Sequence, residues 1–205
     1  YLTGLGIPRD EILQDVLDFW ASRDGRPREG RSGHVITGPV YVEGAEPGDM
    51  LEVRILSVDL WLPVAGQSVR ANLYPDGFVT NRQFVHIIDL ESRTVEYAPG
   101  VVVPLEPFWG VIGVAPPPAM GRVGSGAPNV FGGNMDNRDL GAGSTLYLPV
   151  FNEGALLSIG DGHAAQGDGE VCGTALECAM SVTARIELLK AEPLASPRFT
   201  TPGPV

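Results

Sequence analysis

The 205-residue chain has few basic side chains. Lys190 is its one lysine, and 14 Lys and Arg residues stand against 25 Asp and Glu residues, which gives a formal net charge of −11 and a pI near 4.6. Proteins that hold nucleic acids gather basic side chains into a patch or stripe against the phosphates, whereas the arginines here are scattered along the sequence. We therefore expect no nucleic-acid partner.

Long apolar runs are missing as well. No stretch approaches the roughly 18 to 20 apolar residues that cross a bilayer, and the N-terminus lacks the basic start and apolar core of a signal peptide. We therefore expect a cytoplasmic protein with no membrane partner.

Cysteine is scarce, because Cys172 and Cys178 in CGTALEC are the two copies in the chain. Two cysteines in a chain of this size do not make a disulfide framework, so we interpret them as packed thiols in a reducing compartment. The alternative is a nucleophilic Cys172 that acts together with a glutamate and a lysine. Lys190 lies far along the chain and no histidine neighbours Cys172, which disfavours that alternative.

Glycine and proline are abundant, with 27 and 18 copies, and they separate short runs rich in Val, Ile, Leu and aromatic residues. This pattern is typical of a mainly β protein with many turns, and it favours a β-sandwich or a jelly-roll-like barrel. Within Met50–Val58 the apolar residues Leu51, Val53 and Ile55 alternate with Glu52, Arg54 and Leu56, as expected of a half-buried strand. The predicted strands are Val35–Val42, Asp49–Leu60, Gln83–Asp89, Thr94–Tyr97, Phe108–Val114, Thr145–Val150, Ala155–Gly160 and Val182–Leu189.

One short N-terminal helix is predicted from Arg9 to Ser22, where five apolar residues recur at the spacing of a single helix face: Ile12, Leu13, Val16, Leu17 and Trp20. We divide the chain into an N-terminal helical segment (1–24), a β domain (25–192) and a proline-rich tail (193–205) that is extended or disordered. The stretch from Pro116 to Pro128 offers little to a core, so we expect a mobile or substrate-covering loop there.

Two polar clusters could carry chemistry. The first is FGGNMDNRD, in which two glycines precede Asn134 and Asp136, an arrangement that lets a ligand approach the backbone. An ordinary turn with Asx caps is the alternative. The second is GDGHAAQGDGE, in which Asp161 and His163 point to the same side if the strand continues through them. A carboxylate and an imidazole on one face form half of a metal site, to which Asp136 or Glu170 could add oxygen ligands. A hydrogen-bonded Asp-His pair that fixes a loop is the alternative.

The other two histidines give weaker signals. His34 stands just before a predicted strand, where a histidine taken alone is more often a surface or cap residue than a ligand. His86 lies in the apolar run FVHIID, which favours a packed histidine with its hydrogen bonds satisfied.

Taken together, these segments resemble the acetamidase/formamidase family, and GGNMD and GDGHAAQGDGE are its most specific strings here. The resemblance implies an all-β fold, homo-oligomeric assembly and hydrolysis of formamide, acetamide or similar short amides to the acid and ammonia. It covers the middle of a typical member, so we expect a shortened member or an incomplete chain. The matching stretches are residues 34–56, 107–117, 131–150 and 156–188.

For that reaction we predict a divalent metal ion, zinc by preference and calcium as the other option, that activates a water molecule. Its predicted ligands are Asp136, Asp161, His163 and, conditionally, His34. Glu170 is the predicted general base and acid, with Asp168 as its substitute, and Asn134 with the amides of Gly132 and Gly133 is predicted to hold the substrate. The alternative is a non-catalytic β-sandwich binding module in which the same acids hold a structural Ca²⁺.

Overall fold

The computed structural model describes residues 2–5, 7–25, 34–69 and 81–203. Contacts within the chain divide it into two units, Tyr1–Arg31 and Ser32–Val205, and each is described by itself. Residues 26–33, at the start of the predicted β domain, lie outside the described residues, as do the last two residues of the predicted tail.

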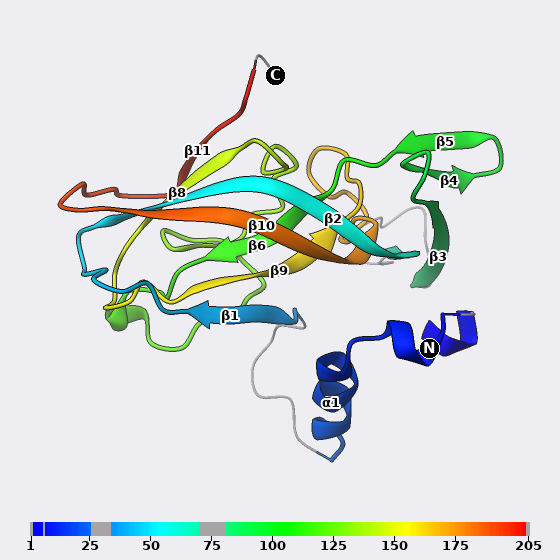
Figure 1. The fold of residues 1–205 in the computed structure, drawn as a ribbon, viewed down its shortest axis with the longest axis horizontal. Helices are drawn as coiled ribbons and strands as arrows, with labels where there is room; N and C mark the ends of the chain where they lie inside the picture. The colour runs from blue at the N-terminus through cyan, green and yellow to red at the C-terminus, as the bar shows by residue number, and fades with distance from the viewer. Residues whose placement is uncertain (1, 6, 26–33, 70–80, 204–205) are drawn as a thin grey trace. The chain divides into compact units, whose positions relative to one another are not determined.

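The N-terminal unit contains one α-helix, α1 (Gln14–Ser22), and two 3₁₀ turns, η1 (Leu2–Leu5) and η2 (Arg9–Glu11) (Figure 1). The prediction of a single helix from Arg9 was wrong at its start. Ile12 and Leu13 have ψ angles of 122° and 136°, which are extended and interrupt the ladder of helical hydrogen bonds. The apolar spacing runs through this break unchanged, so it could not reveal the interruption.

The described residues of the second unit form a β structure that also includes a 3₁₀ turn, η4 (Pro118–Met120). All eight predicted strands overlap an observed strand. The strands β5, β7 and β11 were missed because each has only three or four residues, too few to show an alternating pattern. The strands are β1 (Ile36–Val40), β2 (Met50–Val69), β3 (Arg82–Asp89), β4 (Thr94–Ala98), β5 (Val101–Pro104), β6 (Phe108–Gly113), β7 (Gly132–Asn134), β8 (Thr145–Pro149), β9 (Leu157–His163), β10 (Glu177–Leu189) and β11 (Arg198–Thr200).

The strands form one antiparallel sheet in the order β5-β4-β3-β2-β10-β9-β6-β7, with β1 paired to β9, β8 to β2, and β11 to β8. The long strand β2 organises this sheet, since it pairs with β10 along one edge and with β8 and β3 along the other (Figure 1). The mainly β prediction is confirmed. The predicted barrel is not closed, because the short strands β5 and β7 at the two ends of this order do not pair with each other within the described residues.

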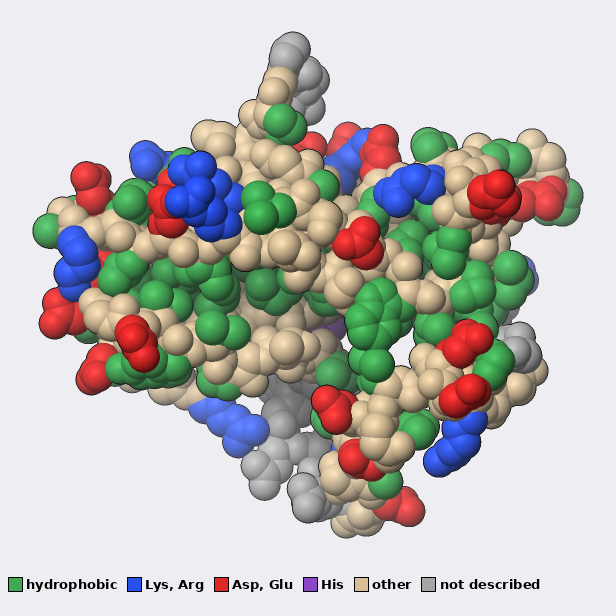
Figure 2. Space-filling view, viewed as in Figure 1, with side chains coloured by type: hydrophobic (Ala, Val, Ile, Leu, Met, Phe, Trp, Pro, Cys, Tyr) green, Lys and Arg blue, Asp and Glu red, His purple; other side chains and the backbone are tan. Residues whose placement is uncertain are grey.

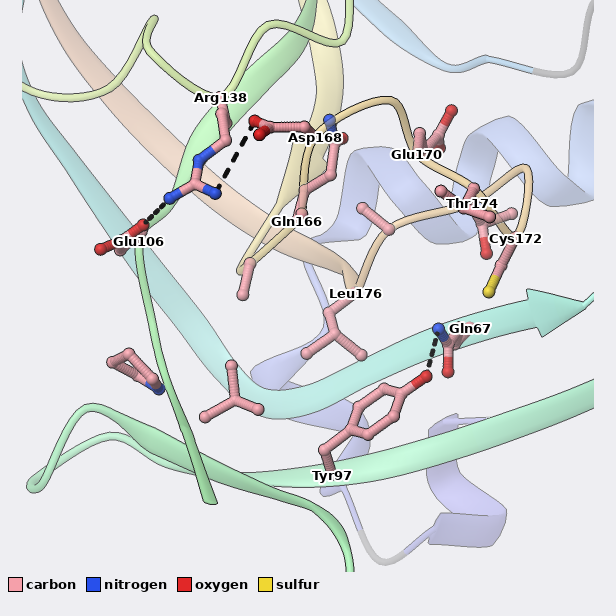
Figure 3. A pocket seen from close by; sticks show the side chains of 16 residues that line it. Gln67, Tyr97, Glu106, Arg138, Gln166, Asp168, Glu170, Cys172, Thr174 and Leu176 are labelled. Carbon is pink, nitrogen blue, oxygen red and sulfur yellow. Dashed lines mark hydrogen bonds and ion pairs between the residues drawn. The ribbon is translucent and has the colours of Figure 1, made fainter. Parts of the chain in front are cut away.

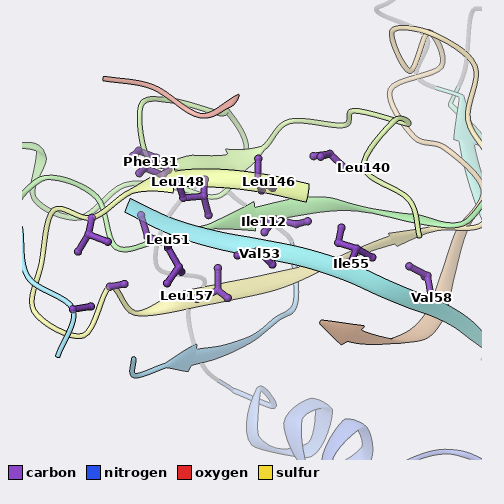
Figure 4. Close-up of a cluster of buried hydrophobic side chains, with 14 residues drawn as sticks. Leu51, Val53, Ile55, Val58, Ile112, Phe131, Leu140, Leu146, Leu148 and Leu157 are labelled. Atoms are coloured by element: carbon purple, nitrogen blue, oxygen red, sulfur yellow. The ribbon is translucent and has the colours of Figure 1, made fainter. Parts of the chain in front are cut away.

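The main hydrophobic core lies along the first half of β2. Leu51, Val53 and Ile55 are at most 1% exposed, whereas Arg54 and Leu56 are exposed, as the alternation predicts. Glu52 departs from the prediction, because it is buried as well. Figure 4 shows these three side chains beside Ile112 of β6 and buried leucines of β8 and β9. The core therefore fixes the relative positions of β2, β6 and β9.

A second, smaller core lies under the other half of the sheet. It contains Ala65 of β2, Ile88 of β3 and Val95 of β4, together with Ala164, Ala165 and Leu176 from the segment between β9 and β10. Because this segment is pinned at both ends by buried side chains, the polar loop between them has fixed anchor points.

On the face shown in Figure 2, Lys and Arg side chains lie in separate groups and form no continuous stripe. Among the described residues no helix is long and apolar enough to cross a membrane.

Candidate metal centre

Strand β9 brings Asp161 and His163 to the centre of a polar cluster. The His163 ring is completely buried, with its edge-to-face partner Phe108 at 4.9 Å between ring centroids. Asp161 Oδ2 lies 3.5 Å from His163 Nε2, so the two side chains meet as predicted. The backbone differs from the expected extended strand, because Asp161 has a φ of 61°.

Asp136 reaches the same place from the turn that follows β7. The backbone amides of Met135 and Asp136 both donate hydrogen bonds to the Gly110 carbonyl oxygen, at 2.9 and 3.2 Å, which holds this turn against β6. Asp136, Asp161 and His163 each offer one donor atom, and these atoms lie within 4.8 Å of one another. The three residues predicted as the main metal ligands are therefore assembled from two distant segments.

Gly110 makes room for this group. A Cβ atom at Gly110 would lie 2.6 Å from Asp136 Oδ1, 2.8 Å from Asp161 Oδ2 and 3.0 Å from His163 Cε1. These separations are well below normal contact distances. The absence of a side chain at this position is thus a condition for the three polar groups to converge.

Two glutamates also lie beside His163. Donor atoms of His163, Glu170 and Glu177 also lie within 4.8 Å of one another. Glu177 begins β10, where it pairs with His163 across the sheet, and its Oε2 is 3.4 Å from His163 Nε2. Glu170 was predicted, whereas Glu177 was missed because the predicted strand began at Val182. The signal available for it was a single acid between the apolar residues Leu176 and Cys178.

The crowding of acids changes their proton affinities. Burial, followed by the charge of Asp136, raises the pKa of Glu170 to about 7, and burial followed by Asp161 raises that of Glu177 to about 7. Burial also raises the pKa of Asp136. Burial pushes the pKa of Asp161 upward, but the neighbouring His163 imidazole outweighs this and lowers it.

The same neighbours act on the imidazole. Burial lowers the pKa of His163, but Asp161 and Glu177 outweigh this and raise it to about 9. Four carboxyl groups thus converge on one ring that carries at most one positive charge. Such an arrangement leaves an excess of negative charge that a divalent cation would neutralise.

Two unpaired atoms provide the test of whether these residues fit a metal ion. Within the described part of the chain, His163 Nε2 and Asp136 Oδ1 are buried and have no hydrogen-bond partner. A buried polar atom without a partner costs free energy, and both atoms belong to the group that converges beside Gly110. One imidazole nitrogen with carboxylate oxygens is a donor set for a borderline or hard divalent ion, so the residues fit.

His34 lies beside this group, on the segment before β1. Gly160 permits the close approach of β1 to β9, since a Cβ there would lie 2.5 Å from the Val35 carbonyl oxygen. His34 Nε2 is 3.7 Å from Asp161 Oδ2, and its Nδ1 is 3.1 Å from the carbonyl oxygen of Ser125. Ser125 belongs to the predicted substrate-covering loop, so part of that loop contacts the cluster through His34. His34 is not a member of either three-residue group.

The remaining predicted substrate and base residues are placed differently. Asn134 ends β7, and its buried Oδ1 has no hydrogen-bond partner among the described residues. The backbone amide of Gly132 already donates a hydrogen bond of 2.9 Å to the carbonyl oxygen of Asn129. Asp168 is 96% exposed and lies 3.9 Å from Arg138, outside both groups.

Three residues that were assigned no metal role also have clear positions. His86 is buried and stacks on Tyr97 at 5.2 Å, which confirms a packed histidine, although its Nε2 has no partner within the described residues and so is not satisfied. Burial, followed by the charge of Glu177, raises the pKa of the Cys178 thiol, which makes it unreactive. Cys172 lines a neighbouring cavity.

That cavity has a volume of about 480 Å³ and adjoins the cluster through Gln166 and Glu170. Its walls include Val103 of β5 and Leu176 before β10. Figure 3 shows a hydrogen-bonded Gln67–Tyr97 pair on one side and the Glu106–Arg138–Asp168 ion pairs on another. The cavity thus offers both apolar and polar contacts beside the acidic cluster.

Comparison with known proteins places this cluster in a family. A model of the Acetamidase/Formamidase family matches residues 22–125 and 123–205. The chain belongs to this family. All the cluster residues lie within the matched ranges, so the acetamidase/formamidase match includes the site as well as the sheet.

Individual relatives of this acetamidase/formamidase chain agree. It is 29% identical to an acetamidase of Mycolicibacterium smegmatis over 77% of this chain and 54% of the relative, and 28% identical to a formamidase of Methylophilus methylotrophus over 89% and 60%. It is also similar to the crystal structure of an acetamidase from Bacillus halodurans, with a TM-score of 0.75 and 37% identity over 81% of this chain and 55% of that one. The chain therefore spans between half and two thirds of the length of these relatives.

Proposed function

We propose that this protein hydrolyses short amides, such as formamide or acetamide, to the carboxylate and ammonia. The observation that carries the proposal is the convergence of four carboxyl groups on the buried imidazole of His163. These groups belong to Asp136, Asp161, Glu170 and Glu177. Family membership and the names of the relatives support the choice of substrate.

In this proposal Asp136, Asp161 and His163 would hold a divalent cation, with His34 beside Asp161. An imidazole ligand favours zinc, while the surplus of carboxylate oxygens leaves calcium as the other choice. When bound, such a cation lowers the pKa of a water molecule and polarises an amide carbonyl.

The side chains of the protein supply the proton transfers. A general base works best when its pKa lies near the working pH, and Glu170 and Glu177 have pKa values raised to about 7. We assign Glu170 to take the proton from the attacking water and to return it to the departing amine, with Glu177 as the second acid of the cluster. The buried Asn134 Oδ1 is available to accept a hydrogen bond from the substrate amide nitrogen. Asp168 keeps no role here because of its exposure.

The adjoining cavity is the place we assign to the acyl group of the amide. Val103 and Leu176 give an apolar wall next to Glu170. The volume of about 480 Å³ exceeds what formamide needs, so chains of several carbons could enter.

Ammonia release tests the proposal. The full chain with added Zn²⁺ should release ammonia from formamide or acetamide, and chelation should stop the release. Glu170→Gln should lower the rate by about 10²- to 10⁴-fold, the range for loss of a general acid or base. Glu91→Gln, at an exposed turn acid, is the matched control and should leave the rate unchanged.

Two ligand variants complete this test. Asp161→Asn and His163→Ala should both abolish metal-dependent release, whereas Asp59→Asn, at an exposed acid of β2, should not. Full activity in both ligand variants would overturn the metal assignment. No ammonia from any short amide would overturn the reaction and favour a non-catalytic module with a structural ion.

Assembly and location are also proposed on the basis of family resemblance and composition. We propose a homo-oligomer in the cytoplasm, with a small amide as substrate. Light scattering on the purified protein tests the assembly, and a monomer at all concentrations would contradict it.

A further inference from the structure

Gln166 connects two of the residues assigned to the metal ion. It lies in the loop after β9, three residues beyond His163, and its side-chain oxygen is 2.9 Å from His163 Nδ1. Its side-chain nitrogen donates a hydrogen bond of 2.8 Å to the backbone carbonyl oxygen of Asp136. One side chain thus contacts both segments that build the cluster.

The chemistry of these two contacts fixes the direction of both. A backbone carbonyl oxygen can only accept, so the NH₂ group of Gln166 must face Asp136. The Oε1 atom of Gln166 must then face His163, and because an amide oxygen also only accepts, His163 Nδ1 must carry a proton. The other ring nitrogen, Nε2, is the one that lies 3.5 Å from Asp161 Oδ2 and 3.4 Å from Glu177 Oε2.

We propose that Gln166 is a positioning residue that keeps the proton of His163 on Nδ1 and thereby leaves Nε2 to bind the divalent cation. The inference rests on the proposed function for the presence of that cation. It adds a residue that also lines the adjoining cavity but acts on the ion only through the orientation of the His163 ring.

The surroundings of the ring leave this task to Gln166. The His163 side chain is 0% exposed, so bulk water does not reach Nδ1 to replace the amide oxygen. Phe108 contacts the ring edge-on and can restrict its rotation, but its hydrocarbon ring offers no acceptor to the Nδ1 proton. Metal-bound histidines commonly donate their second N–H to such an outer partner, which sets the tautomer and the ring orientation.

Three glutamine variants separate this role from simple loop support. Gln166→Leu removes both contacts, while Gln166→Glu keeps an acceptor for His163 but loses the donor to Asp136. Gln67→Leu is the matched control, because it removes a buried glutamine of the same cavity that donates a hydrogen bond to Tyr97 and not to the cluster. The measurement is the Zn²⁺ dissociation constant by competition with a chromophoric chelator, with a thermal unfolding curve of each metal-free variant.

Gln166→Leu should weaken Zn²⁺ binding by about 10- to 100-fold, the usual effect of losing an outer partner of a metal ligand. The Zn²⁺ dissociation constant of Gln166→Glu should stay within about tenfold of the parent value. That of Gln67→Leu should equal the parent value. Equal losses in Gln166→Leu and Gln166→Glu would overturn the inference, because they would assign the effect to the contact with Asp136. Unchanged binding in Gln166→Leu would overturn it as well.

Nitrogen NMR gives a second readout that loop support would not change. The chain has three histidines, so ¹⁵N-labelled rings can be assigned from a small spectrum. In the zinc-loaded protein His163 should keep a proton on Nδ1 and have none on Nε2, and a proton on Nε2 instead would overturn the inference. Failure of the parent protein to bind Zn²⁺ at all would instead overturn the proposed metal site on which the inference rests.

Discussion

Replacing Gly110 with alanine tests the geometry of the cluster with one methyl group. The added Cβ would meet Asp136 Oδ1 at 2.6 Å and Asp161 Oδ2 at 2.8 Å, whereas comfortable contacts begin near 3.5 Å. Both obstructing atoms are carboxylate oxygens at the ends of side chains. They can turn away from the methyl group, and in doing so they leave the positions from which they would bind an ion.

The expected loss therefore falls on metal binding more than on folding. Overpacking a tight site costs about 1 to 3 kcal/mol, and this cost would weaken Zn²⁺ binding by about 5- to 150-fold. The assay is chelator competition for Zn²⁺, with thermal unfolding of the metal-free protein beside it. The matched control is Gly66→Ala in β2, where a Cβ would meet nothing within 4 Å.

The result that would refute this reasoning is specific. If Gly110→Ala bound Zn²⁺ as tightly as Gly66→Ala, the carboxylates near Gly110 could not be ligands. If both variants lost affinity equally, the effect would belong to glycine replacement in the sheet and not to the cluster.

Three further predictions concern stability. Because the pKa values of Glu170 and Glu177 are raised from 4.5 to about 7, the native state binds more protons than the unfolded state, and metal-free protein should lose stability as pH rises from about 4.5 through 7. Thermal unfolding at pH 5.5 and pH 8 checks this, and equal midpoints would contradict it; added Zn²⁺ should narrow the difference. The hydrogen bond from Lys190 is the main reason why the pKa of Asp49 is lowered to about 2, so Lys190→Met should raise that pKa. In denaturant titrations the variant should be less stable than its parent at pH 7 and equally stable below pH 2. A deficit that persists below pH 2 would argue against the ion pair as its cause. Leu148→Ala, at a fully buried core position, should cost about 2 to 5 kcal/mol in urea unfolding, and a loss under 1 kcal/mol would speak against the described core.

Local patterns in the sequence predicted much of the sheet. The alternation of Leu51, Val53 and Ile55 with polar neighbours is a local property of an antiparallel strand with one buried face, and it located β2 and the core. The same reasoning could not reveal the length of β2, which continues to Val69 because β3 and β10 pair with it there. Closure of the sheet is likewise decided by pairing between distant strands, so the barrel prediction had no local support.

In the candidate site, too, the residues fixed by local sequence were predicted and those fixed by long-range pairing were not. Asp161 and His163 are two residues apart, so the sequence and the family resemblance predicted that they meet, but the left-handed backbone at Asp161 was not predicted. Glu177 was missed because only the register between β9 and β10 places it beside His163. The role of Gly110 could not be predicted from the sequence either. A glycine in an apolar strand does not indicate which side chains a Cβ atom at its position would contact in the folded protein.

The most direct test of the central claim is the zinc content of the purified protein, measured by elemental analysis after incubation with Zn²⁺ and removal of the excess. The account predicts one equivalent per chain in the parent protein and a clear deficit in His163→Ala, with Glu91→Gln retaining the full equivalent. Zinc at background level in the parent protein, or one equivalent retained by His163→Ala, would contradict it.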